Sequence, residues 1–205
     1  MRVAAVVAVL VSGCTKATPK EPETTVPTAP AVTTAAPATT TAPADPFAVP
    51  TVVDVAYVDR VLAALDQVRG DAVRSIVLQR RVDAAAIERI RAIYNDPAFQ
   101  ISAESIQMIP SEDLTRYKAP PGDRRTRVQR IVSSGPSCVV FESIVDFSAV
   151  VLNPPPHLTD ERDVMVLAPT QPGADPKELN PTPWSIRYAA VIKTGQVAEG
   201  ATCTG

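Results

Sequence analysis

Residues 138–152 read CVVFESIVDFSAVVL, and this stretch decides the fold class. One set of alternating positions is apolar: Val139, Phe141, Val145 and Phe147. The acidic residues Glu142 and Asp146 occupy the other set. Because successive side chains of a β-strand point to opposite faces, the pattern predicts a strand with one face in the core and one toward water.

Three further segments with β character surround this strand, at residues 126–132, 164–167 and 184–193. The last of them alternates. Its predicted inward residues are Trp184, Ile186, Tyr188 and Ile192, and its predicted outward residues are Ser185, Arg187 and Lys193. The second half of the domain is therefore expected to form an antiparallel sheet.

The segment before the sheet has helical periodicity. Apolar residues recur every three or four positions: Val58, Val61, Leu62, Leu65 and Val68. Thr51 and Asp54 have capping-box spacing, and Gly70 is expected to end this first helix. Two more helices are predicted over residues 71–80 and 83–94. Helices followed by strands predict an α+β fold, with amino-terminal helices packed on a curved antiparallel sheet.

This order of elements resembles the SnoaL-like, nuclear-transport-factor-like cone fold across roughly residues 52–193. The resemblance rests on the helix Tyr57–Val68 with Gly70-Asp71, the Asn95-Asp96-Pro97 break and the Trp184-Ser185-Ile186 strand. It implies a pocket on the concave face of the sheet, around Phe147, Trp184 and Tyr188. The long loop at residues 168–183 departs from compact members of the family.

Residues 14–50 are rich in Thr, Pro and Ala. Such a segment has no periodic apolar face to bury, so we expect a disordered tether. Thr/Pro-rich stalks are often O-glycosylated, and composition does not separate a glycosylated stalk from a bare linker. The globular domain is expected to occupy residues 51–205.

Residues 1–13 have the pattern of an export signal, with Arg2 followed by an apolar run from Val3 to Val11. That run is too short for a permanent membrane span. Val11-Ser12-Gly13-Cys14 resembles the lipobox of bacterial lipoproteins, and the tethered domain is similar in composition to lipoproteins of actinobacteria. The resemblance implies lipid on Cys14 and a location on the extracytoplasmic face of the membrane. The alternative is a buried cysteine beside an apolar strand.

If Cys14 carries lipid, Cys138 and Cys203 remain as an even pair in an oxidising compartment. We therefore expect a disulfide between them that stabilises the domain without taking part in chemistry. Two separate thiols, one of them redox-active, are the alternative.

The formal net charge of −2 argues against a nucleic-acid partner. No phosphate-binding loop, dinucleotide motif or zinc-type cluster is present, so no cofactor or metal is expected. The single histidine, His157, is expected in a solvated turn rather than in a catalytic or metal site. A basic group follows at Arg124, Arg125, Arg127 and Arg130; it is read as a charged edge strand, with a contact to an anionic wall polymer or a partner as the alternative.

These features favour a non-enzymatic accessory domain of the cell envelope that binds a small apolar ligand or an envelope protein. One alternative is a small pocket enzyme of the isomerase or cyclase type, with Glu142 or Asp146 as general base. A second alternative is a structural subunit of an envelope secretion or conjugation machine. No residue is assigned a catalytic role.

Overall fold

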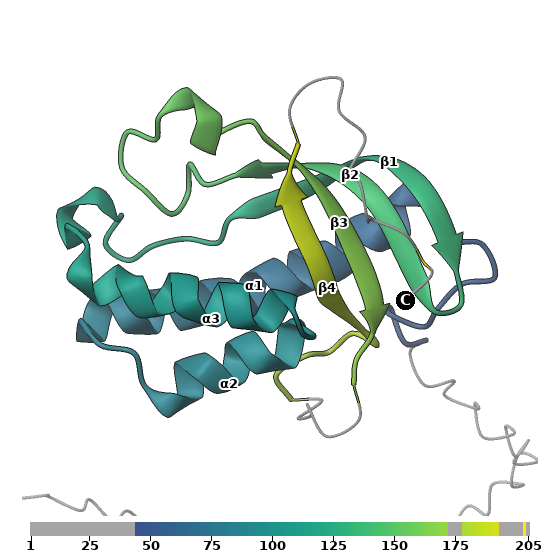
Figure 1. The fold of residues 1–205 in the computed structure, drawn as a ribbon, viewed down its shortest axis with the longest axis horizontal. Helices are drawn as coiled ribbons and strands as arrows, with labels where there is room; N and C mark the ends of the chain where they lie inside the picture. The colour runs from purple at the N-terminus through teal and green to yellow at the C-terminus, as the bar shows by residue number, and fades with distance from the viewer. Residues whose placement is uncertain (1–43, 172–177, 193–202, 204–205) are drawn as a thin grey trace, which may run out of the picture. The chain divides into compact units, whose positions relative to one another are not determined.

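The computed structural model describes residues 44–171, 178–192 and 203. The predicted signal (residues 1–13), Cys14 and the predicted tether up to residue 43 lie outside the described residues. Three helices come first: α1 (Val55–Gln79), α2 (Ala84–Ile93) and α3 (Ala98–Met108). Four strands follow: β1 (Arg125–Gly135), β2 (Cys138–Asp146), β3 (Glu161–Pro169) and β4 (Trp184–Val191). The predicted α+β class is confirmed (Figure 1).

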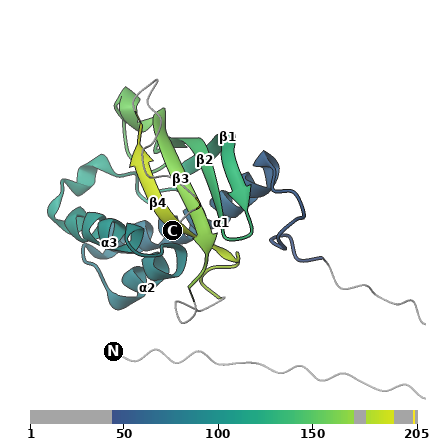
Figure 2. The same ribbon diagram turned by 45° about the vertical axis from the view of Figure 1, so that its right-hand side comes forward.

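The strands form one antiparallel sheet in the order β1-β2-β3-β4, with the helices packed on one of its faces (Figures 1 and 2). The β1–β2 pairing shifts register twice, and the β3–β4 pairing shifts once. Such irregularities bend a strand and increase its twist, which curves the sheet around the helices. Short 3-10 turns at Ile109–Ser111, Leu114–Arg116 and Pro156–Leu158 lie in the connections.

The first helix differs from its prediction because Gly70 does not end it. α1 starts after the N-cap Asp54, whose side chain accepts the Tyr57 amide N–H, and continues through Gly70 to Gln79. A β-carbon at Gly70 would lie 1.9 Å from Oδ1 of Asp123. Glycine at position 70 therefore allows Asp123 to approach the helix closely, and it does not end the helix.

α3 was not anticipated from the sequence, which predicted only a helical break at Asp96-Pro97. Pro97 is the N-cap residue of this new helix, and no side-chain hydrogen bond caps it. Phe99, Ala103 and Ile106 form its buried face at helical spacing. The proline thus separates α2 from α3 rather than ending the helical region.

The predicted alternation of β2 is confirmed, since Val139, Phe141 and Val145 lie in the core between sheet and helices. The opposite face of the sheet carries a second cluster of buried residues: Cys138, Val140, Val164 and Val166. Tyr188, Ile192 and Cys203 pack against that second cluster. Within the described residues, no helix combines the length and apolar character that a membrane span requires.

Candidate ligand-binding site

The three residues predicted to line a pocket lie in three different environments. Trp184 is buried in the core, where its Nε1 donates a hydrogen bond to the Tyr57 hydroxyl at 2.9 Å. Phe147 is partly buried and lines a cavity just beyond the end of β2. Tyr188 packs on the outer face of the sheet. The structure therefore places only Phe147 at a cavity.

A register shift explains the position of Tyr188. Val166 pairs with Tyr188, but the next residue, Leu167, pairs with Ile186, so Arg187 is an extra residue in β4. One inserted residue reverses the alternation of every side chain that follows. The predicted inward orientation of Tyr188 is wrong for this reason.

Glu142 and Asp146, the residues considered as a general base, lie on the outer face of β2. Glu142 accepts a hydrogen bond from Nε of Arg130 at 2.9 Å, and this bond lowers the pKa of its carboxyl. The backbone N–H of Ser148 lowers the pKa of Asp146 in the same way. A carboxylate with a lowered pKa holds protons poorly near neutral pH, so neither residue suits that role.

The basic group of residues 124–130 is split between the two faces of β1. Arg125 and Arg127 are exposed, as expected for a charged edge strand. Arg130 pairs with Glu142 on the outer face, whereas Arg124 points to the helices. Simple alternation predicts Arg125 and Arg127 on one face and Arg124 and Arg130 on the other; the register shift after Val128 moves Arg130 to the outer face, so the second half of that expectation is wrong.

A buried ion pair joins α1 to β1. Asp66 accepts hydrogen bonds from Nε of Arg124 at 2.6 Å and from the backbone N–H of Thr126 at 2.8 Å. The Arg124 side chain is only 10% exposed, and its Nη2 donates to the Tyr94 hydroxyl at 3.2 Å. Both groups of this pair are hydrogen-bonded, as a buried ion pair requires.

Arg69 lies one turn after Asp66 and adds a second guanidinium to this group. Burial lowers the pKa of Arg69, and the positive charge of Arg124 lowers it further. Burial acts to raise the pKa of Tyr94, but the two guanidiniums outweigh it and the net shift is downward. Nε of Arg69 is buried and has no hydrogen-bond partner within the described part of the chain.

The sheet contributes three more buried polar atoms without partners among the described residues: Oγ1 of Thr126, Oγ of Ser143 and Oδ1 of Asp163. Ser143 and Asp163 are directly opposite each other on β2 and β3. Burial, together with the negative charge of Glu161, raises the pKa of Asp163 to about 6, although Arg124 acts in the opposite direction. Asp163 is therefore a carboxyl that exchanges protons near neutral pH.

A cavity of about 340 Å³ is lined in part by Arg69 and by Glu161, a residue that acts on the pKa of Asp163. Its apolar wall comes from α1, the turn after α3 and the β2–β3 connection: Val73, Ile109, Phe147, Val150, Val151 and Leu158. Its polar lining comprises Arg69, Ser105, Glu112, Arg116, Tyr117 and Glu161. The Tyr117 hydroxyl donates to Glu112 at 3.0 Å.

A larger hollow of about 630 Å³ lies along the seam between α1 and β1. Its two α1 carboxylates already have partners, because Asp59 accepts the backbone N–H of Val128 and Asp66 accepts that of Thr126. These bonds satisfy donors of the edge strand. The smaller cavity is taken as the candidate site, because its lining includes Arg69, whose buried Nε has no hydrogen-bond partner among the described residues.

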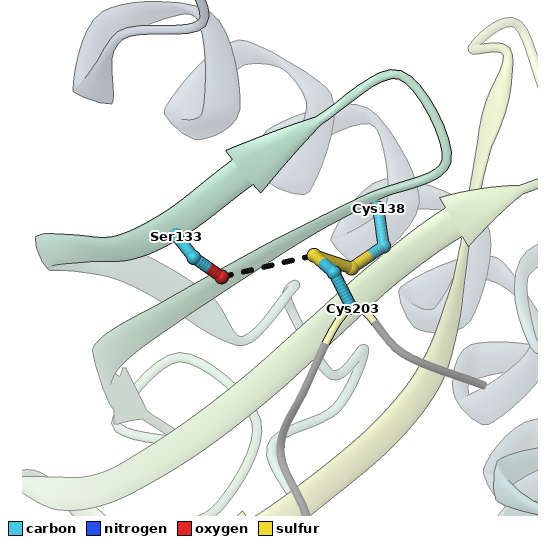
Figure 3. Close-up of a disulfide and its surroundings, with 3 residues drawn as sticks. All are labelled: Ser133, Cys138 and Cys203. Atoms are coloured by element: carbon cyan, nitrogen blue, oxygen red, sulfur yellow. Dashed lines mark hydrogen bonds between the residues drawn. A yellow bond between two sulfur atoms is a disulfide. The ribbon is translucent and has the colours of Figure 1, made fainter.

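The two cysteines of the predicted pair meet on the outer face of the sheet (Figure 3). Cys138 and Cys203 are joined with their Cα atoms 5.4 Å apart, and the Cys203 sulfur lies 3.7 Å from the Ser133 hydroxyl. His157 is exposed in the short turn Pro156–Leu158. The described residues contain no group of three or more His, Cys, Asp or Glu side chains that could hold a metal ion.

Sequence reasoning missed Arg69 and Asp163, although both carry a readable signal. Arg69 lies four residues after Leu65 and four before Val73, within the buried stripe of α1. Asp163 precedes Met165 by two positions, in phase with the buried face of β3. Charged residues at inward positions mark sites with a special function, because burying an unpaired charge is costly.

Comparisons with protein-family models, with curated proteins and with solved structures found no match to this chain.

Proposed function

We propose that this chain is a lipid-anchored envelope protein whose globular domain binds a small molecule with an apolar body. The observation that carries the proposal is the 340 Å³ cavity, which combines an apolar wall with a few polar groups, among them Arg69 with its buried Nε. Ligand pockets have this composition: mostly apolar lining, with a few placed polar groups that fix orientation.

Anchoring rests on the sequence, in particular on the apolar run that ends in Val11-Ser12-Gly13-Cys14. Lipid on Cys14 would hold the domain at the extracytoplasmic face of the membrane. Membrane fractionation of the wild type and of Cys14→Ser tests this proposal. The variant is expected in the soluble fraction; a variant that stays membrane-bound and is processed normally contradicts it.

Ligand binding is tested by filling the cavity. Ser105 is an exposed residue of α3 that lines the cavity, so Ser105→Trp should occupy it without disturbing the core. Glu104 is an exposed neighbour on α3 that is not part of the lining, and Glu104→Trp is the matched control. Both changes are made in the full chain carrying Cys14→Ser.

The probe is the neutral molecule 3-phenylpropan-1-ol, and binding is followed by NMR titration. We expect Ser105→Trp to weaken binding at least about tenfold, while Glu104→Trp leaves it unchanged. Equal binding by the two variants, or no binding by the parent protein, would contradict the proposal.

Asp163 favours a second candidate function, a small pocket enzyme that moves a proton. Its buried carboxyl titrates at about 6, near the range that suits a general base. In deuterated water, the parent protein would then exchange the acidic hydrogens of 4-phenylbutan-2-one faster than Asp163→Asn. Equal exchange rates would exclude this candidate for that class of substrate.

A further inference from the structure

The lining of the cavity carries two guanidiniums, Arg69 and Arg116, and two carboxylates, Glu112 and Glu161. Arg124 and Asp66 are not part of this lining and pair with each other. Asp66 and a hydrogen bond with Tyr94 act to raise the pKa of Arg69, but its buried Nε has no hydrogen-bond partner among the described residues. The Arg69 guanidinium therefore lines the cavity with one donor unsatisfied.

Burial makes the unsatisfied donor of Arg69 important. The guanidinium of Arg69 is in a site that disfavours its charge, since both burial and Arg124 lower its pKa. An anion bound there would relieve both effects, and hydrogen bonds between a guanidinium and a carboxylate are about twice as strong as neutral ones.

The opposite side of the cavity limits the charge of the ligand. Glu112 and Glu161 are part of the lining, and they would repel a multiply charged anion such as a phosphate monoester. A ligand with one negative charge at Arg69 and an apolar body along Val73, Phe147 and Val150 would pair with the guanidinium and limit repulsion by the two carboxylates.

From these observations we propose that the cavity binds a monocarboxylate with an apolar body, whose carboxylate pairs with Arg69. This inference rests on the proposed binding function. The cavity of about 340 Å³ is at the small end of ligand pockets and roughly twice the size that holds a benzene molecule. One ring with a short acidic chain matches that volume.

Three probes of equal size test the charge: 3-phenylpropanoate, 3-phenylpropanamide and 3-phenylpropylammonium. They are titrated at neutral pH into the full chain carrying Cys14→Ser. The carboxylate is expected to bind at least about tenfold more tightly than the amide, and the ammonium more weakly than both. The NMR signal of the Arg69 Nε–H should move with the carboxylate alone.

Arg69→Gln should abolish the preference for the carboxylate while leaving binding of the amide in place. Arg81→Gln is the matched control, because Arg81 is exposed and is not part of the cavity lining. If Arg69→Gln fails to fold, the three-probe comparison and the Arg69 signal in the parent protein still decide the matter.

The outcomes separate the two proposals. Equal binding of all three probes, blocked by Ser105→Trp, overturns the carboxylate inference and leaves the binding function standing. No binding of any probe overturns the binding function itself. A carboxylate preference that survives in Arg69→Gln would overturn the assignment to Arg69.

Discussion

The space between the sheet and the helices differs in its hydrogen bonding from one end to the other. We call the end around Trp184 the closed end, and the end around Arg69, Thr126, Ser143 and Asp163 the polar end. At the closed end, Trp184 is buried and its one polar atom is bonded to Tyr57, whose hydroxyl in turn donates to the carbonyl of Phe47 at 3.0 Å. Asn180 donates to the carbonyls of Ala92 and Trp184. At the other end, Asp66 and Arg124 are paired, but several buried polar atoms have no partner among the described residues.

The unpartnered buried polar atoms are distributed unevenly between the two ends. Five buried side-chain nitrogen or oxygen atoms have no hydrogen-bond partner among the described residues. Four of them surround the polar end: those of Arg69, Thr126, Ser143 and Asp163. An unsatisfied buried group costs about 1–3 kcal/mol, so this end stores a cost that a bound ligand could offset. The closed end therefore stabilises the fold, whereas the unpartnered atoms of the polar end cost stability.

The largest expected effect comes from breaking the closed end. Trp184→Ala should lower the free energy of unfolding by about 3–5 kcal/mol, because it leaves a cavity and removes the partner of Tyr57. Urea unfolding measures this. Ser143→Ala is the control at the polar end and should change stability by less than about 1 kcal/mol, or increase it, since it removes an unpartnered hydroxyl. Similar losses of unfolding free energy from Trp184→Ala and Ser143→Ala would contradict the difference between the two ends.

The outer face of the sheet provides a region independent of both ends. Replacing Cys138 and Cys203 with serine should cost about 2–4 kcal/mol and lower the melting temperature by several degrees. Ligand binding by the folded fraction should not change. Mass spectrometry of the exported, non-reduced protein checks the bond directly, and two thiols that alkylate without reduction would rule it out.

The third prediction concerns the buried carboxyl of Asp163. Below about pH 4 this carboxyl is protonated in both the folded and the unfolded chain, and it costs nothing. Between about pH 4 and 6, the unfolded chain loses this proton while the folded chain keeps it, so stability falls as the pH rises. Above that range the cost is constant, on the order of 2–3 kcal/mol for a pKa raised from 3.8 to about 6.

Asp163→Asn removes this cost. Its free energy of unfolding should exceed that of the wild type at pH 7 and match it near pH 4. Urea unfolding at both pH values measures the difference. A variant that is less stable at pH 7, by the same amount as at pH 4, would mean that Asp163 has a charged partner in the fold.

The sequence predicted the class of fold and the inward face of β2 because both follow from local periodicity. The helix through Gly70 and the reversal at Arg187 could not be predicted in this way. A side chain at Gly70 would collide with Asp123, which is far along the chain, and the register shift at Arg187 is defined only by the pairing of β4 with β3. The candidate site was predictable in part. Phe147 followed from the alternation of residues 139–147, whereas finding Arg69 and Asp163 would have required placing charged side chains at buried positions.

The smallest expected effect comes from Glu142, one of the two acids that the sequence suggested as a general base. Its partner Arg130 is 62% exposed, and exposed ion pairs contribute little because water and salt screen them. Glu142→Gln should therefore leave the unfolding midpoint, the pH dependence of stability between pH 4 and 7 and the binding of 3-phenylpropanoate within error of the wild type. The same acid-to-amide change at Asp163 alters the pH dependence, so the two variants together isolate burial as the cause. A pH profile of Glu142→Gln that resembles that of Asp163→Asn would place the titrating carboxyl on the outer face and remove the distinction between the two sides of the sheet.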